Sequence, residues 1–358
     1  MPKAMLDEAK TAAFMARLVD VLNGGALSLM ISIGHRTGLF DVMARLAPSS
    51  SDTIAARAGL SERYVREWLG ALVTGGIVEY EPAARVYRLP PEHAAALARD
   101  ARGANLAGTA QCISLLGAVE DEVVGCFERG DGIPHTSFER FQCAMAEERD
   151  RTVAPRLVEE VLPLVPGARS GLVTGIDVLD VGCGSGRALH MLAHSFPNSR
   201  FTGIDLSVEA IGRARQDAAA HRLPNLRLEV RDVADLSLTD AFDLVLAFGA
   251  IHEQARPAAA LEAIARALRP DGVFLMQEVA GTSHLERDSG LALAPLLYTI
   301  SCLHCVTVSL AADGAALGAM WGEEVARRML GAAGFDAVEV HSLPRDAVHR
   351  YYVAGRTP

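Results

Sequence analysis

The sequence predicts an α/β protein in which a mostly parallel, doubly wound sheet follows an N-terminal domain of helices and a winged helix. Three observations lead to this fold class. Apolar strand segments alternate with helices beyond residue 171, a glycine-rich loop joins the first strand to its helix, and a helix-turn-helix with a short hairpin comes earlier. Such alternation is typical of a parallel sheet that helices cover on both faces.

The winged-helix pattern occupies residues 50–88. Ser51 or Asp52 can cap a short helix that ends at Gly59, and Ser61 can cap a second helix that stops at a Gly-Gly pair. The segments "IVEY" and "VYRL" then have the composition of two strands that flank a turn. Helix, turn, helix and a two-stranded wing together predict a winged-helix unit.

A DNA-reading regulator is one interpretation of this unit. Five arginines and five acidic residues lie between residues 50 and 88, so the segment has no net charge. Because affinity for duplex DNA comes largely from neutralising phosphates, the segment has little to offer a duplex. Its second helix carries Tyr64, Val65, Trp68 and Leu69, which suit packing better than contact with a groove. DNA binding is therefore the less favoured alternative.

Length and composition restrict the other classes of protein to which the chain could belong. A chain of 358 residues is long enough for more than one domain, and we divide it into residues 1–95, a helical connector over 96–170, and a sheet domain over 171–358. It has no uninterrupted apolar run of the ~20 residues that a membrane span needs. The net charge of −10 argues against nucleic acid as a partner, and six irregularly spaced cysteines suggest reduced thiols and a cytoplasmic protein.

The glycine-rich loop lies in "VLDVGCGSGRAL", where Gly182, Gly184 and Gly186 are spaced G-x-G-x-G between a strand and a helix. Glycines there let the backbone approach a ligand closely, at the carboxyl edge of the sheet where open α/β folds bind ligands. A nicotinamide-binding domain is the alternative, but the later glycine of G-x-G-x-x-G is missing. Two acids follow at strand ends, Asp205 in "FTGIDLS" and Asp232 in "EVRDVADL", which suit ribose hydroxyls and an adenine amino group respectively.

These motifs resemble, in order and spacing, those of the class I S-adenosylmethionine (SAM)-dependent methyltransferases over residues 172–358. The resemblance implies a seven-stranded sheet whose last strand, "YYVAGR", runs antiparallel. It also implies that the glycine loop holds the methionine part of SAM, Asp205 the ribose, and Asp232 with Val233 the adenine. The residues expected at the cofactor are Asp180, Gly182, Cys183, Gly184, Gly186, Asp205, Leu206, Asp232, Val233 and Phe248.

The order of winged helix, helical connector and methyltransferase domain is similar to that of the small-molecule O-methyltransferases. In that family the front domain dimerises and helps to close the substrate pocket, which implies a homodimer here. The connector segment "FQCAMAEER" resembles a helix that lines the active site in that family, so Phe141 and Met145 are expected to bind substrate.

The stretch "AFGAIHEQ" follows the fourth strand and contains the catalytic candidates His252 and Glu253. The unperturbed pKa of histidine lies near neutral pH, so a histidine can remove a proton from an acceptor. In the resembled O-methyltransferases a His-Asp-Trp triplet occupies this position, and its histidine is the base. Here the triplet is His252-Glu253-Gln254, so either of the first two could face the acceptor. A purely local role of His252 in shaping the loop is the alternative.

Residues 280–321 form an unusually long connection after the fifth strand. In the resembled fold, insertions at this place cover the acceptor pocket, so Tyr298, His304, Met320 and Trp321 are candidate substrate-binding residues. "CLHC" raises a zinc interpretation, but a single C-x-x-C without a second pair falls short of a tetrahedral site, and buried thiols are favoured. We therefore expect no metal.

The favoured function is SAM-dependent methyl transfer to oxygen or nitrogen of a small molecule, with S-adenosylhomocysteine as the product. A SAM-binding regulator with a winged-helix DNA-binding domain is one alternative. A methyltransferase that acts on a macromolecule is another, and no membrane partner is expected.

Overall fold

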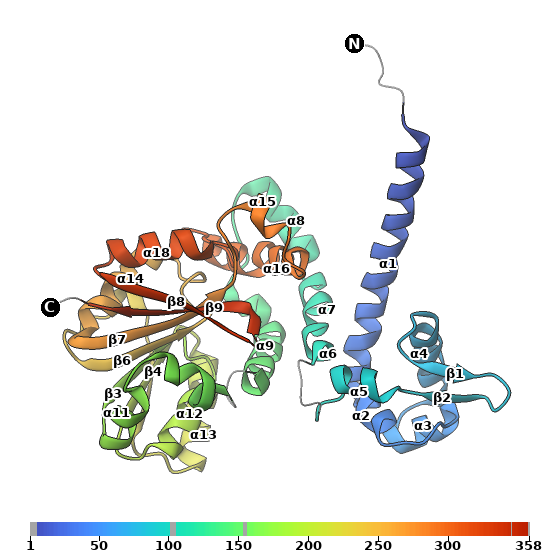
Figure 1. Ribbon diagram of the computed structural model, residues 1–358, viewed down its shortest axis with the longest axis horizontal. Coiled ribbons are helices and arrows are strands. Elements are labelled where there is room, and N and C mark those ends of the chain that lie inside the picture. Colours follow the sequence, from blue (N-terminus) through green and yellow to red (C-terminus); the bar gives the residue numbers. More distant parts are fainter. Residues whose placement is uncertain (1–5, 101–104, 153–155, 345, 357–358) are drawn as a thin grey trace. The chain divides into compact units, whose positions relative to one another are not determined.

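The computed structural model describes residues 6–100, 105–152, 156–344 and 346–356. The chain divides into two compact units, Met1–Ala118 and Val119–Pro358 (Figure 1). The first has one hydrophobic core and the second has two, one on each face of a sheet. The first domain expected from the sequence, 1–95, lies within the first unit, and the third, 171–358, lies within the second.

The first unit consists of seven helices and a hairpin in the part of the chain that the structure describes. In chain order they are α1 (Glu8–Thr37), α2 (Leu39–Ala44), α3 (Ser51–Ala58), α4 (Glu62–Thr74), β1 (Glu79–Glu81), β2 (Val86–Arg88), α5 (Pro91–Leu97), α6 (Leu106–Thr109) and α7 (Gln111–Gly117).

The predicted winged helix is confirmed by α3, α4 and the antiparallel hairpin β1–β2. The predicted cap of α3 was wrong, because Ser50 has the extended backbone of a cap and accepts a hydrogen bond from the Thr53 amide at 3.3 Å, whereas Ser51 is already helical. On α4, Val65, Trp68 and Leu69 are buried as expected. Tyr64, however, is 80% exposed, because it lies at the edge of the buried face.

Helix α1 exposes apolar side chains along much of its length. They include Phe14, Met15, Leu18, Val19, Val21, Leu22, Leu29 and Ile33. By length and apolar composition alone, α1 and residues 294–311 could each cross a membrane. This is weak evidence for a membrane span, because core helices of soluble proteins and signal sequences meet the same criterion. The apolar surface of α1 suits burial against a partner better than exposure to water.

The second unit carries the sheet and the helices around it. Its elements are α8 (Glu120–Arg129), η1 (His135–Phe138), α9 (Glu139–Thr152), η2 (Leu157–Val161), η3 (Leu162–Leu164), α11 (Ala168–Thr174), β3 (Asp177–Val181), α12 (Arg187–Ser195), β4 (Arg200–Asp205), α13 (Val208–Ala220), β5 (Leu226–Val230), η4 (Val233–Asp235), β6 (Phe242–Phe248), α14 (Pro257–Ala267), β7 (Leu268–Val279), α15 (Leu285–Asp288), α16 (Ala294–Ile300), η5 (Ser301–Val306), α17 (Thr307–Ala311), α18 (Gly322–Ala332), β8 (Ala337–Leu343) and β9 (Asp346–Gly355).

The seven strands of this unit form one sheet in the order β5-β4-β3-β6-β7-β9-β8. Strands β3 to β7 are parallel, and β9 pairs antiparallel with both β7 and β8. The expected seven-stranded sheet with an antiparallel last strand is therefore confirmed. Because Val181 of β3 is paired with Ala247 of β6, the loops that follow these two strands leave the sheet side by side.

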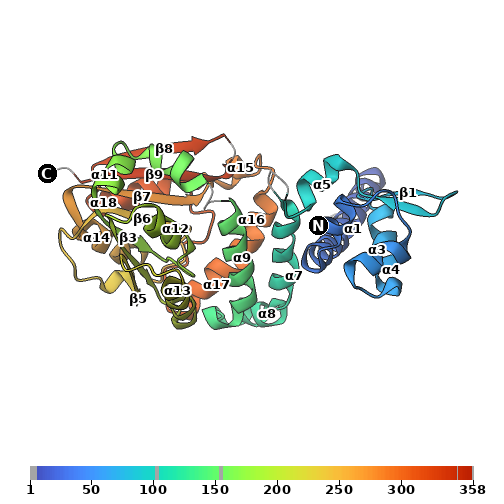
Figure 2. The ribbon, with the colours of Figure 1, turned by 90° about the horizontal axis from the view of Figure 1, so that it is seen from below.

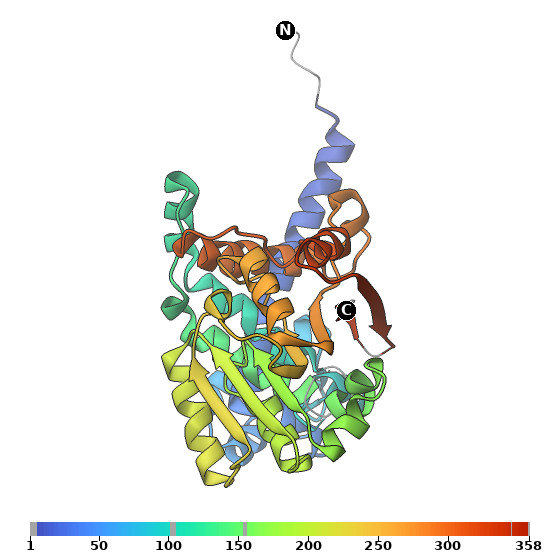
Figure 3. The ribbon, with the colours of Figure 1, turned by 90° about the vertical axis from the view of Figure 1, so that its left-hand side faces the viewer.

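Helices cover both faces of the sheet (Figures 1 and 3). Alternate residues of the strands face opposite sides, as the two-residue period of a strand requires. Leu179 and Val245 pack with α14 and α18 on one face, and Val178 and Leu244 pack with α11, α12 and α13 on the other. This double burial explains why the central strands are almost continuously apolar.

A buried carboxylate secures the beginning of β9. Asp346 accepts hydrogen bonds from the Tyr351 hydroxyl at 2.6 Å and from Nδ1 of His349 at 2.8 Å. Burial raises the pKa of the Asp346 carboxyl, but the bonds to His349 and Tyr351 and the charge of His349 lower it more, so its pKa lies well below the usual range. The ionised carboxylate therefore stabilises the folded sheet.

We expect Asp346→Asn to lower the free energy of unfolding by about 1–3 kcal/mol at neutral pH. A carboxyl whose pKa is depressed in the folded chain contributes stability above its unfolded pKa of about 4, and that contribution is lost as the pH falls through the folded pKa. The difference between variant and wild type should therefore be complete at about pH 7 and shrink below about pH 4. Urea unfolding at several pH values measures it, with the exposed Asp271→Asn as control. A difference that does not change with pH would contradict the assignment.

Candidate active site

The glycine-rich loop leaves β3 with a left-handed backbone at each predicted glycine. The φ angles are 67° at Gly182, 53° at Gly184 and 70° at Gly186, a region that disfavours residues with a Cβ. A Cβ added at Gly182 would lie 2.6 Å from the Cβ of Ala250 in the loop after β6. Gly182 therefore allows the loops after β3 and β6 to approach each other, while a Cβ at Gly184 would meet no heavy atom within 4 Å.

Asp205 ends β4 beside the same loop. One carboxylate oxygen accepts from the amide of Gly184 at 2.9 Å, and the other accepts from the amide of Ser207 at 2.8 Å. These bonds fix the orientation of the carboxylate, and each oxygen keeps a second lone pair that can accept from a ribose hydroxyl. The geometry fits the role expected of Asp205.

The other cofactor candidates lie on the same part of the sheet. Asp232 accepts from the amide of Ala234 at 2.8 Å and from Arg256 at 2.8 Å, and so holds a fixed orientation. Val233 is buried after β5, whereas Leu206 is 61% exposed after β4. The remaining candidates lie at strand ends: Asp180 and Phe248 are buried on β3 and β6, and Cys183 is half-buried in the glycine loop, where burial raises the pKa of its thiol.

His252 is buried in the loop after β6 and is held by a second buried acid. Its Nδ1 lies 2.5 Å from Oε2 of Glu278 on β7. The other oxygen of Glu278 accepts from the amide of Ile251 at 3.1 Å, and Nε1 of Trp321 donates to Oε2 at 3.3 Å. Glu278 therefore joins the catalytic candidate, the end of β7 and the far end of the long insertion.

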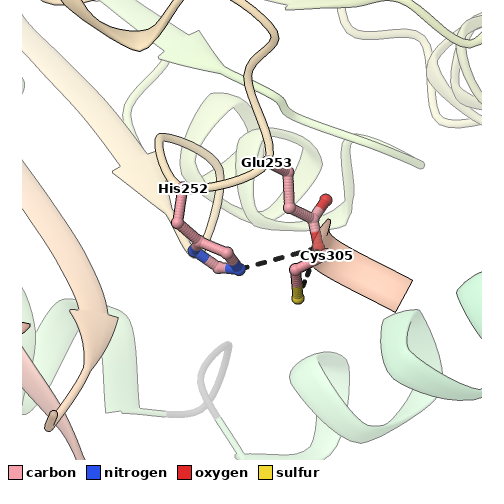
Figure 4. Close-up of side chains that lie close together, drawn as sticks. All are labelled: His252, Glu253 and Cys305. Carbon is pink, nitrogen blue, oxygen red and sulfur yellow. Dashed lines mark hydrogen bonds and ion pairs between the residues drawn. The ribbon is translucent and has the colours of Figure 1, made fainter. Parts of the chain in front are cut away.

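The second ring nitrogen of His252 faces Glu253 and Cys305 (Figure 4). Nε2 of His252 is 3.8 Å from Oε1 of Glu253, and the thiol of Cys305 is 4.0 Å from that same oxygen. Burial lowers the pKa of His252, but the charges of Glu278 and Cys305 outweigh it and raise that pKa well above the usual value. For Cys305 the effects are reversed: burial raises the pKa of the thiol, but the neighbouring His252 lowers it by more, so the pKa lies below its usual value. His252 and Glu253 thus point into one shared cluster.

His304 lies on the other side of Glu253 and is almost fully buried. Its Nδ1 is 3.4 Å from Oε1 of Glu253, although neither ring nitrogen makes a hydrogen bond of acceptable geometry. Burial lowers the pKa of His304, while the charge of Glu253 and the neighbouring Cys305 raise it to about 9. Its ring packs against Phe138 and Phe141, with centroids 4.8 and 4.6 Å away.

Within the second unit, the segment that contains η1 and α9 packs beside the insertion at this point (Figure 2). The amide of Ile133 donates to the hydroxyl of Thr307 at 2.8 Å, and Phe141 of α9 is buried against His304. Met145, one turn later on α9, is half-buried. The predicted substrate residues Phe141 and His304 are therefore brought together.

The remaining substrate candidates lie elsewhere in the insertion. Tyr298 is 37% exposed, and its hydroxyl donates to Asp288 at 2.9 Å, so it serves a separate network. Met320 and Trp321 are buried, and Trp321 reaches the cluster through Glu278. In "CLHC", the expectation of buried thiols holds for Cys305 and is wrong for Cys302, which is exposed because it lies on the outer side of η5.

Glu278 and Phe138 were not predicted from the sequence, and neither was the proximity of Cys305 to His252. A signal for Glu278 was present, since an acid interrupts the apolar end of "GVFLMQEV" on the strand next to β6. Phe138 and Cys305 had none, because their partners are distant in the sequence.

Comparison with known proteins finds two matched regions in the chain. Residues 25–99 match the family model of an Rv2258c-like winged HTH domain, and residues 172–323 match that of a methyltransferase domain. A fatty-acid O-methyltransferase of Mycolicibacterium smegmatis is 36% identical over 35% of this chain and 45% of its own length. A trans-aconitate 2-methyltransferase of Deinococcus radiodurans is 31% identical over 37% of this chain and 46% of its own. The chain thus spans about half the length of the curated relatives that it matches.

Solved structures share the fold at low sequence identity. An O-methyltransferase family protein from Burkholderia thailandensis has a TM-score of 0.67 at 17% identity, with 96% of this chain and 98% of that chain covered. Human N-acetylserotonin methyltransferase in complex with SAM has a TM-score of 0.66 at 18% identity, with 99% and 100% covered. The fold and the matched regions together define a class I methyltransferase fold. This chain carries a winged-helix domain followed by a methyltransferase domain, as the sequence resemblance implied.

We expect Gly182→Ala to destabilise the chain more than Gly184→Ala, by at least about 1 kcal/mol, without any added ligand. Both glycines have positive φ and so share the backbone penalty, but only a Cβ at Gly182 collides with Ala250. Thermal or urea unfolding of the two variants measures the difference. Equal losses would show that backbone strain, and not contact between the two loops, determines the choice of glycine.

Proposed function

We propose that this chain transfers the methyl group of SAM to an oxygen or nitrogen atom of a small molecule. The observation that carries the proposal is that the glycine loop, the fixed carboxylate of Asp205 and the cluster of His252 and Glu253 follow β3, β4 and β6, three neighbouring strands. The methyltransferase-domain match and the methyltransferase relatives support it.

The reaction needs alignment more than covalent help from the protein. A lone pair of the acceptor forms a bond to the methyl carbon, the carbon–sulfur bond breaks, and its electrons return to sulfur to give S-adenosylhomocysteine. The protein has to hold the acceptor in line with that bond and exclude water. The buried aromatic residues Phe138 and Phe141 beside His304 offer an apolar wall for this purpose.

An acceptor hydroxyl must also lose a proton, and His252 with Glu253 is proposed as the acid–base pair. Glu278 occupies Nδ1 of His252, so Nε2 is the nitrogen that can exchange a proton with an acceptor. The raised pKa of His252 favours the cationic form of its ring. Glu253 is then the group able to accept the proton, and the His252 cation stabilises the developing negative charge.

Saturating S-adenosylhomocysteine should raise the melting temperature by about 5–10 °C, as expected for a ligand at about 100 times its Kd. With labelled SAM and a hydroxyl acceptor, His252→Ala and Glu253→Gln should each lower turnover by at least about 100-fold. A carboxylate acceptor is already deprotonated at neutral pH, so the loss should be small there. A screen with a fatty acid, trans-aconitate, a phenol and an amine finds the acceptor.

His284→Ala is a matched control, because this half-buried histidine pairs with the exposed Glu324 outside the cluster. Its turnover should stay within about two-fold of wild type. Absence of any thermal shift with SAM and with its demethylated product would remove the proposed function. Full turnover of both variants on a hydroxyl acceptor would remove only the acid–base assignment.

The charged side chains of the winged helix favour a structural role for this unit over DNA binding. Ion pairs already engage three of its arginines, joining Arg63 to Glu67, Arg66 to Glu62 and Arg88 to Glu79. Neutralised arginines add little to phosphate binding. The regulator therefore remains the weaker candidate.

We further propose a cytoplasmic homodimer in which α1 buries its exposed apolar side chains against a second copy. Leu22→Glu should then yield a monomer, because a charge in an apolar interface costs several kcal/mol, whereas Ala13→Glu on the opposite side of the helix should not. Size-exclusion chromatography with light scattering measures the mass. A monomeric wild type, or its partitioning into lipid vesicles, would overturn this arrangement.

A further inference from the structure

A group of three different donor atoms meets at the end of β6. Nε2 of His252, a carboxylate oxygen of Glu253 and Sγ of Cys305 all lie within 4.8 Å of one another (Figure 4). Two of the residues come from the loop after β6, and the third comes from η5 in the long insertion. His252 and Cys305 are buried, and Glu253 is about one-third exposed, so the group is shielded but reachable.

The spacing is close to that of a metal site. Zinc bonds of about 2.0–2.3 Å to nitrogen, oxygen and sulfur place tetrahedral donors roughly 3.3–3.6 Å apart. The donors here are 3.8 Å apart between His252 and Glu253, and 4.0 Å apart between Cys305 and Glu253. These two pairs would have to contract by roughly half an ångström, and the pair of His252 and Cys305, which lies within 4.8 Å, by roughly one ångström at most.

The kinds of donor select the metal. Imidazole and thiolate favour zinc over magnesium or calcium, which prefer oxygen ligands. One thiolate and one carboxylate also balance the two positive charges of the ion, which matters in a buried place. The donor set therefore fits zinc better than magnesium or calcium.

One outer contact of the kind that supports zinc ligands is present, and a second group lies close by. Glu278 binds Nδ1 of His252 at 2.5 Å and so directs Nε2 toward the cluster. This arrangement of carboxylate, histidine and metal is frequent in zinc proteins. On the other side, His304 is almost fully buried, and its Nδ1, which makes no hydrogen bond, lies 3.4 Å from the Glu253 carboxylate. A small rotation of that ring lets it support a ligating carboxylate.

We propose that His252, Glu253 and Cys305 bind one Zn²⁺ ion. Three protein ligands leave a fourth position, as in zinc sites that bind water or a substrate. The expectation of no metal rested on Cys302 and Cys305 as a pair, whereas the fold exposes Cys302 and buries Cys305 beside His252.

One consequence rests on the proposed function. A zinc ion held by His252, Glu253 and Cys305 would lower the pKa of an acceptor hydroxyl in the fourth position, so that its proton would be lost to solvent more easily before methyl transfer. Nε2 of His252 binds zinc only when it carries no proton, so His252 is not a cation in the loaded protein. The loaded protein would therefore rely on the metal, and the metal-free protein on the acid–base pair.

The test uses the full chain, purified metal-free, and titrates it with Zn²⁺ and with Co²⁺. Wild type should bind one equivalent of either ion, and cobalt should show the charge-transfer absorption of a thiolate ligand. Cys305→Ser should lose that absorption and weaken zinc binding by at least about ten-fold, and Glu253→Gln should weaken it similarly. Cys302→Ser is the matched control, since it lies on the same turn but is exposed, and it should behave as wild type.

Binding of less than one equivalent by wild type, or equal weakening in the two cysteine variants, would overturn the site. Unfolding curves of the metal-free variants show whether Cys305→Ser folds, and Glu253→Gln provides the second reading if it does not. The thermal shift with S-adenosylhomocysteine separates the proposals. A shift without zinc binding rejects the metal site alone, and zinc binding without a shift rejects the methyltransferase function alone.

Discussion

The arrangement of the candidate site depends on one buried carboxylate, Glu278. A charged group without solvent is costly unless its lone pairs are satisfied, and Glu278 meets this condition with three donors from two segments. They are the amide of Ile251, the ring of His252 and the indole of Trp321. The same bonds hold the loop after β6 against β7 and tie the end of the long insertion to both. Loss of this carboxylate would therefore release the histidine and the segment that covers it together.

Parallel strand geometry explains why chemical groups gather here. The carboxyl ends of parallel strands share one edge of the sheet, and loops after neighbouring strands leave it together. The glycine loop, Asp205 and His252 follow three such neighbours, β3, β4 and β6. The contact between Gly182 and Ala250 shows how closely two of these loops approach. The insertion then supplies Cys305 and His304 from above this edge, which a short connection could not do.

The sequence predicted the features that depend on local pattern. The glycine loop, the acids at strand ends and the winged helix follow from residue type and spacing over a few positions, and the structure contains each of them. The antiparallel last strand was implied by the resemblance to class I methyltransferases, and the structure contains it too. Contacts across long separations were not predictable in this way. Cys305 is 52 residues from Glu253, and Glu278 is 26 residues from His252. Tyr298 met the same pattern as His304 but faces Asp288, because orientation within the insertion depends on packing.

By itself, the sequence determined the fold class, the cofactor loop and the presence of a histidine–glutamate pair after β6. These depend on hydrophobic periodicity, on glycines at positive φ and on residues adjacent in the chain. Only the tertiary structure decided what His252 faces. Its Nδ1 is taken by a carboxylate from the next strand, and its Nε2 meets a thiol from the insertion, so a pair of neighbours in the sequence became a cluster of five ionisable groups. The physical reason is that packing, and not spacing along the chain, brings buried charges to the partners that satisfy them.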